Sequence, residues 1–154
     1  MTEPDQILNI AEKRLTLRKS AKLRHRTLVQ DLFHEGKSVY SGPLRITFRT
    51  LSQEELEASF RVSVPDLMGP VQFMITVPKK KRRHAVDRVL MRRRIREAFR
   101  LQWHPLRHLI ENDPSIRTLS LAIVYMDTEN TGMDSIMNAM GSALSKIRKK
   151  IFDT

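Results

Sequence analysis

The chain has 154 residues, of which 40% are hydrophobic and 29% are charged, a balance that is typical of one globular domain and excludes a disordered chain. Its 28 Lys and Arg residues outnumber its 17 Asp and Glu residues and give a formal net charge of +11, so we expect a polyanionic partner, with nucleic acid ahead of an anionic membrane surface. Cysteine is absent, which excludes disulfides and thiolate metal sites, and no apolar run is long enough to span a membrane.

The first 22 residues predict a flexible arm that becomes basic toward its end. The first ten of them are acidic and lack the charged-then-apolar order of a secretory signal, so we expect a cytoplasmic protein. The remaining residues, 23–154, are expected to form a single domain.

The first predicted helix covers about residues 27–35. Thr27 and Gln30 have the spacing of a capping box, and Gly36 is placed to end the helix. The apolar stripe of this helix consists of Leu28, Val29, Leu32 and Phe33.

Three extended segments are predicted next. Alternating apolar and polar residues predict a strand over residues 44–48, and a second extended segment is expected over about 60–64. The polar, acidic stretch 53–57 between them is expected to be a loop. The mostly apolar stretch 71–77 predicts a strand that is buried on both faces.

The second half of the chain alternates between helix and strand. A helix is predicted over about 87–103, and Pro105 ends or kinks it. A strand over 118–125 and a final helix over about 134–152 follow. Because a strand, a helix and a strand in that order imply a parallel crossover, we expect an α+β fold, a two-layer α-β sandwich with a mixed sheet of about four strands.

Most of the charge lies in residues 79–100, which read KKKRRHAVDRVLMRRRIREAFR. This segment contains 11 Lys and Arg and two acids, a net charge of +9 out of +11 for the whole chain. On a helical wheel Arg92, Arg93, Arg96 and Arg100 share the face opposite the apolar stripe Met91, Ile95, Ala98 and Phe99. A solvated helix surface would carry interspersed acids, so the pattern favours an array that binds the phosphates of a nucleic acid.

The run HAVDR…RRRIREAFR within residues 79–100 resembles the signature of the bacterial ribonuclease P protein subunit. Residues 30–38 (QDLFHEGKS) are similar to the first helix of that family and the turn after it, and residues 73–80 to its central strand. The resemblance covers about residues 24–151. It implies an α-β sandwich with a left-handed crossover at the central basic helix, of the kind found in the second domain of ribosomal protein S5, and makes residues 23–154 an RNA-binding domain.

The resemblance also implies a function. Members of the family assist the removal of the 5′ leader from precursor tRNA, an endonucleolytic reaction that the RNA subunit of the ribonucleoprotein carries out with magnesium ions. The expected partners are the ribonuclease P RNA and precursor tRNA, with no membrane and no required protein partner. No side chain of this chain is expected to be catalytic, and the place of the metal ions stays open.

By position, the residues expected to bind RNA are Lys79, Lys80, Arg82, Arg83, Arg88, Arg92, Arg93, Arg96 and Arg100. The residues expected to line the cleft for the leader are Val29, Phe33, Lys37, Tyr40 and Phe48. An aromatic ring in such a cleft stacks on bases of any sequence, although Phe33 is as well explained as an ordinary core residue.

Two positions depart from the family pattern. The family has Arg-Asn-Arg where this chain has Arg88, Val89 and Leu90, so a metal or RNA contact made there by relatives is in doubt. Val29 stands where some relatives have an aromatic residue.

The alternative to the ribonuclease P function is a non-enzymatic RNA-binding protein of the ribosomal or RNA-chaperone type. His104 and His108 have the spacing of a zinc pair, but Pro105 and the missing glutamate argue for a surface pair.

Overall fold

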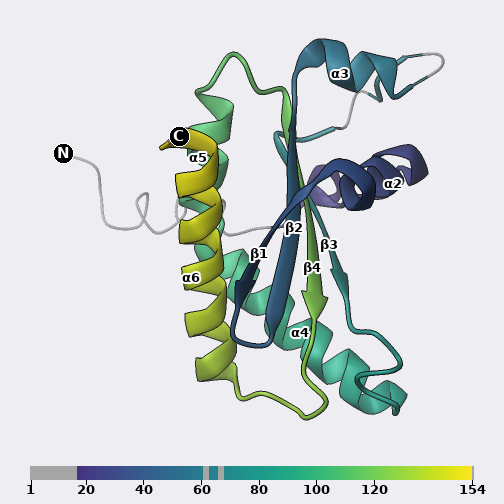
Figure 1. Ribbon diagram of the computed structural model, residues 1–154, viewed down its shortest axis with the longest axis vertical. Coiled ribbons are helices and arrows are strands. Elements are labelled where there is room, and N and C mark those ends of the chain that lie inside the picture. The colour runs from purple at the N-terminus through teal and green to yellow at the C-terminus, as the bar shows by residue number, and fades with distance from the viewer. Residues whose placement is uncertain (1–16, 61–62, 66–67, 154) are drawn as a thin grey trace, which may run out of the picture.

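The computed structural model of the protein describes residues 17–60, 63–65 and 68–153. A four-stranded mixed sheet in the order β1-β2-β4-β3 forms its centre (Figure 1), with β3 parallel to β4 and the other neighbours antiparallel. The elements in chain order are η1 (Lys19–Ala21), α2 (Arg26–Glu35), β1 (Lys37–Ser41), β2 (Leu44–Leu51), α3 (Gln53–Ala58), β3 (Val71–Thr76), α4 (Ala85–Gln102), α5 (His104–Glu111), β4 (Thr118–Tyr125) and α6 (Met133–Phe152).

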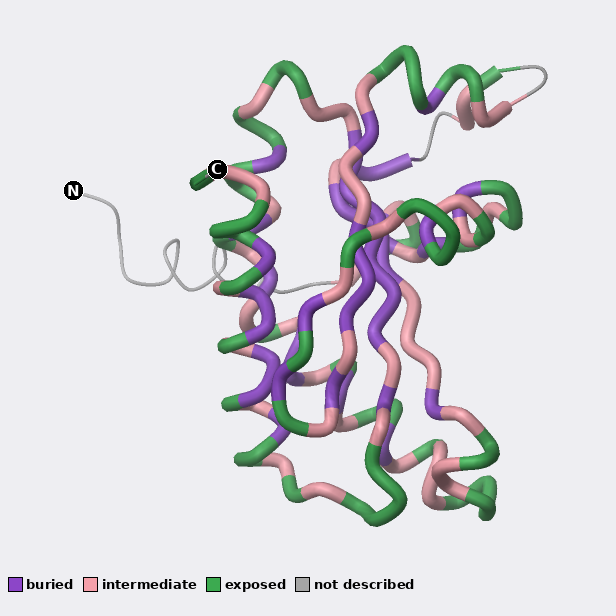
Figure 2. Tube along the Cα trace, in the orientation of Figure 1, coloured by how far each residue is buried: buried purple, intermediate pink, exposed green. Residues whose placement is uncertain are grey.

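Helices pack on both faces of this sheet. Alternate residues of β4 point to opposite faces, so Leu121 and Ile123 join the large core under α4, α5 and α6, whereas Ala122 joins a smaller cluster under α2 and α3. Figure 2 shows the buried residues concentrated in the sheet and on the inner side of α6. The predicted α+β fold with a mixed four-stranded sheet is confirmed, and α4 and α5 form the crossover between the parallel strands β3 and β4.

The first strand of the sheet is one that the sequence patterns missed. β1 follows α2 directly and pairs with β2 through a tight turn in which Gly42 has a φ of 52°, a conformation that favours glycine. The extended segment expected at 60–64 is wrong, because none of its described residues belongs to a strand. Phe60 packs instead on the smaller cluster, where its ring meets the ring of His25 edge-on at 5.0 Å.

The stretch 53–57 is also not the expected loop, because residues Gln53–Ala58 form α3. Ser52 and Glu55 form a reciprocal capping box at its start, and Leu56 is buried against α2 and β2. A single buried leucine is too weak a periodic signal to predict a helix, but the Ser52–Glu55 spacing was visible in the sequence.

The start and end of α2 differ in how well the sequence predicted them. The capping box expected at Thr27 is wrong, since the helix begins at Arg26 and its N-cap, His25, makes no side-chain cap. Gly36 ends the helix as predicted, with its amide donating to the Leu32 carbonyl at 2.8 Å. A Cβ at Gly36 would lie 2.4 Å from that carbonyl oxygen and 2.8 Å from Cγ2 of Thr47 in β2, so only glycine fits between α2 and β2 at this position.

Residues 17–22, the described end of the expected arm, pack onto the domain. Ala21 is buried in the large core, and Lys22 forms a parallel β-bridge with Phe73 of the edge strand β3. The amide of Leu23 donates to the Phe73 carbonyl at 2.9 Å. The expected boundary between residues 22 and 23 therefore does not coincide with a change in packing, and the rest of the expected arm lies outside the described residues.

α4 confirms the predicted amphipathic helix. Its apolar stripe, Met91, Ile95, Ala98 and Phe99, is buried, and the Phe99 ring lies between those of Phe73 and Trp103 at centroid distances of 4.4 and 5.4 Å. The predicted end near Pro105 is confirmed, because α4 stops at Gln102 and the proline occupies the first turn of α5. The packing of this stripe turns the arginine face of α4 outward.

Candidate nucleic-acid interface

The outward face of α4 carries three arginines that the structure leaves unoccupied. Arg92, Arg93 and Arg96 are exposed and make no hydrogen bond or ion pair with any described residue. Because arginine stays charged at every physiological pH and its planar fork fits phosphate oxygens, such groups suit a polyanion.

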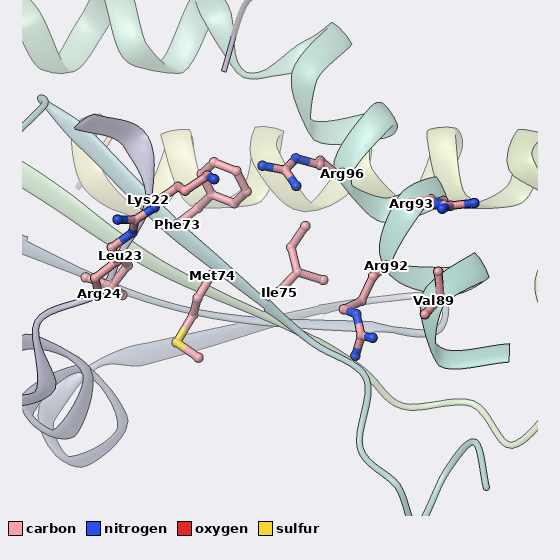
Figure 3. A pocket seen from close by; sticks show the side chains of 10 residues that line it. All are labelled: Lys22, Leu23, Arg24, Phe73, Met74, Ile75, Val89, Arg92, Arg93 and Arg96. Atoms are coloured by element: carbon pink, nitrogen blue, oxygen red, sulfur yellow. The ribbon is translucent and has the colours of Figure 1, made fainter. Parts of the chain in front are cut away.

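These arginines form one wall of a groove of about 450 Å³ at the open edge of the sheet. The floor comes from β3, through Phe73, Met74 and Ile75, and the opposite wall comes from the segment Lys22, Leu23 and Arg24 (Figure 3). The segment stands there because its β-bridge to Phe73 holds it along the edge of β3.

The groove is cationic on both sides. Its lining contains five cations, Lys22, Arg24, Arg92, Arg93 and Arg96, and no acid. Positive walls above an apolar floor can hold the phosphates of a nucleic-acid strand while its bases contact the floor.

Glu97 is the acid on α4 that stands beside this wall, and it is paired with Arg100. The Arg100 Nε donates to Glu97 Oε2 at 2.9 Å and its Nη2 to Oε1 at 2.6 Å. These hydrogen bonds, with the charge of Arg100, hold the pKa of Glu97 below its ordinary value despite partial burial. Arg100, expected to bind RNA, is thus occupied by a carboxylate, and Glu97 does not compete for Arg92, Arg93 or Arg96.

The cations of the basic loop before α4, residues 79–83, likewise include some that have partners and some that do not. Lys79, Lys80 and Arg83 are exposed and have no partner among the described residues. Arg82 instead pairs with Asp87 at 3.1 Å and donates to the carbonyl of Thr128. These contacts leave the three exposed cations of the loop free to meet phosphates.

Arg88 also differs from the expectation, because its Nη1 donates to the carbonyls of Arg82 and Arg83 at 3.1 and 2.7 Å. Of the nine residues expected to bind RNA, six present unoccupied cationic groups and three, Arg82, Arg88 and Arg100, have partners within the described chain.

The residues expected to line a leader cleft differ in how far they are exposed. Phe33 and Tyr40 are exposed, by 45% and 63%, and Lys37 is exposed too. Val29 is half-buried against the smaller cluster. Phe48 is only 4% exposed and belongs to the large core, so its expected place in a cleft is wrong. Because alternate residues of β2 point to opposite faces of the sheet, Phe48 points toward the face covered by α6 and not toward the face covered by α2.

Two cations of the groove were missed at the sequence level. Lys22 and Arg24 reach the groove only through the pairing of their segment with β3, a contact between residues about 50 positions apart. The basic character of the chain before α2 was the available signal. Val89, the valine in place of the family's asparagine, lines the same groove and is 37% exposed.

The described residues contain no group of three or more His, Asp and Glu arranged to hold a metal ion. The rings of His104 and His108 lie 6.5 Å apart on α5. None of the described helices is long and apolar enough to cross a membrane.

Comparisons with known proteins agree with one another. A family model described as Ribonuclease P matches residues 17–147. Ribonuclease P protein components from two strains of Porphyromonas gingivalis are each 28% identical over 131 residues, which cover 85% of this chain and 85% of the relative.

Solved structures of Staphylococcus aureus RNase P protein share the fold at 16% identity. One gives a TM-score of 0.56 over 84% of this chain and 97% of that chain. A mutant of that protein with defective mRNA degradation activity gives 0.55 over 95% and 98%.

Proposed function

Because the chain belongs to the ribonuclease P protein family, we propose that it binds the RNA subunit of ribonuclease P and assists the removal of the 5′ leader from precursor tRNA. The observation that carries the proposal is the groove between α4 and residues 22–24, with five cations on its walls, an apolar floor and no acid in its lining. Membership of the family does not by itself require that Arg92, Arg93 and Arg96 lack side-chain partners among the described residues.

The mechanism that we propose for this chain is binding. Arg92, Arg93 and Arg96, with the loop cations Lys79, Lys80 and Arg83, meet phosphates of the RNA subunit, and each contact releases condensed counterions. Because these contacts neutralise backbone charge, they recognise the fold of the RNA rather than its sequence. The protein thereby lowers the repulsion that the RNA must overcome to hold its substrate.

The substrate contact that we propose is a single-stranded leader segment held by stacking and by phosphate contacts. Phe33 and Tyr40 are the exposed aromatic side chains available for stacking, with Val29 and Lys37 on the same two elements, α2 and β1. Because every base has a flat face, such contacts tolerate leaders of different sequence.

Hydrolysis belongs to the RNA subunit in this proposal. Magnesium ions bound by that RNA would supply the Lewis acid that activates water, and no step is assigned to a metal held by the protein. The protein would act in the cytoplasm without a required protein partner.

Leader removal at limiting magnesium tests the proposal. Purified protein is added to a transcribed ribonuclease P RNA and a precursor tRNA, and the initial rate of leader release is measured with and without protein. A large increase in rate is expected for precursor tRNA. Binding of RNA without an increase would refute the proposal and favour the non-enzymatic RNA-binding alternative.

A further inference from the structure

Side-chain hydrogen bonds and an ion pair join the loop between β4 and α6, residues 127–131, to the start of α4. Asp87 accepts from Asn130 Nδ2 at 3.0 Å and pairs with Arg82 at 3.1 Å. Arg82 also donates to the carbonyl of Thr128 in the same loop. One carboxylate at the first turn of α4 thus links the basic loop before the helix to a loop more than 40 residues further on.

The basic loop is held from inside by Arg88. Its Nη1 donates to the carbonyls of Arg82 and Arg83, while the amides of Lys81 and Arg82 donate to the Pro78 carbonyl at 3.0 and 3.1 Å. The carbonyls of Pro78, Arg82 and Arg83 therefore accept hydrogen bonds from within the chain. A loop closed in this way presents the side chains of Lys79, Lys80 and Arg83 to solvent and leaves that of Lys81 half-buried.

The far side of the network is anchored in the core. Arg94 Nη1 donates to the Thr131 carbonyl at 2.6 Å. The hydroxyl of Thr131 lies 2.7 Å from the hydroxyl of Tyr125, whose ring is buried at the end of β4. The loop between β4 and α6 is consequently fixed at both ends and can serve as a rigid support.

We propose that Arg82, Arg88 and Arg94 are positioning residues, which hold the cationic loop 79–83 in its RNA-binding shape against the loop 127–131, and that they do not themselves contact RNA. A guanidinium group that already donates to carbonyls and a carboxylate would have to break those bonds before it could bind a phosphate. The affinity test of this inference rests on the proposed RNA binding, whereas the hydrogen bonds of the network are features of the structure itself.

Removing the carboxylate of Asp87 distinguishes two possible roles of Arg82, a phosphate contact and a positioning residue, because they predict opposite changes in RNA affinity. If Arg82 is a phosphate contact, Asp87→Ala frees a cation and should tighten binding of a transcribed ribonuclease P RNA about fivefold at 0.1 M salt, the effect of one added contact. If Arg82 positions the loop, the same substitution loosens the loop and weakens binding by about the same factor, despite the gain in net positive charge.

Glu54→Ala is the matched control. Glu54 is likewise an acid in the first turn of a helix, α3, and it has no partner among the described residues. Figure 1 shows α3 at the opposite end of the molecule from the start of α4. The control makes the same change in charge, so it should leave RNA affinity within about twofold of the unmodified protein.

Asn130→Ala supplies a second variant that changes no charge and tests the support loop itself. We expect it to weaken RNA binding in the same direction as Asp87→Ala. In the free protein, both variants should speed hydrogen exchange at the amides of Lys81 and Arg82, while the amides of α4 under Arg92 and Arg96 keep their protection.

The proposal is overturned if Asp87→Ala binds RNA as tightly as the unmodified protein or more tightly, or if the two loop amides exchange at unchanged rates. Failure of the proposed function has a different signature: the unmodified protein would fail to bind the RNA at all, and the exchange measurements would still decide whether the network holds the loop.

Discussion

Neutralising the arginine wall of the groove should weaken RNA binding by a salt-dependent factor that the structure lets us estimate. The variant carries Arg92→Gln, Arg93→Gln and Arg96→Gln. These side chains are exposed and without partners among the described residues, so their loss should leave folding intact. If each meets one phosphate, the slope of log K against log salt should fall by about 0.7 to 0.9 per residue, or about 2 to 3 in total.

At 0.1 M salt this change in slope corresponds to a loss of about 10²-fold or more in affinity. The assay is fluorescence anisotropy of a labelled, transcribed ribonuclease P RNA titrated with protein between 50 and 300 mM KCl. Circular dichroism before and after heating checks that the variant folds like the unmodified protein.

A control variant separates local contacts from bulk charge. Arg148→Gln, Lys149→Gln and Lys150→Gln remove the same three charges from the exposed end of α6. If this variant loses as much affinity and slope as the α4 variant, binding follows net charge alone, and the reasoning from the groove is refuted.

Three further predictions concern the fold that carries the groove. Gly36→Ala places a Cβ 2.4 Å from a backbone carbonyl oxygen and should lower the free energy of unfolding in urea by about 1 to 3 kcal/mol; an unchanged midpoint would contradict the close approach. Arg49→Met removes a cation that pairs with three carboxylates of α2 and α3 at 3.1 to 3.9 Å, and should cost about 1 kcal/mol in the same assay, more at low salt than at high salt. The pKa of Asp87 is lowered chiefly by the hydrogen bond from Asn130, with help from Arg82. Its contribution to stability is therefore present above its ordinary pKa of 3.8 and is lost as the pH falls through the lower folded value, so the stability difference between the unmodified protein and Asp87→Ala should vanish in strong acid; a difference that persists there would refute the ionic role.

The elements that the sequence predicted well are those whose signals are local. The stripe Met91, Ile95, Ala98 and Phe99 repeats with the period of a helix, and its burial follows from that pattern. The strand predicted over 118–125 matches β4, because a long run of apolar and β-branched residues strongly favours a buried strand over other secondary structure. Short elements such as β1 and α3 carry too few residues for a periodic signal, and both were missed or misassigned.

The candidate site was predictable in composition but not in the state of its side chains. The sequence placed a cationic helix in the middle of the chain, and that helix lines the groove. It could not distinguish Arg92 from Arg88, although one is exposed without a partner and the other is bound to two carbonyls. The difference arises because Arg88, near the start of α4, lies beside the basic loop, whereas Arg92 lies one turn later and lines the groove.

The sequence by itself determined that this chain has one strongly basic amphipathic helix, which predicts a polyanionic partner, because charge and helical period can be read from neighbouring residues. Only the tertiary structure decided which cations remain available. The pairing of residue 22 with β3 brings Lys22 and Arg24 across from α4, and the loop after β4 occupies Arg82. Both contacts join segments far apart along the chain, so they depend on how the sheet is assembled and leave no periodic trace in the sequence.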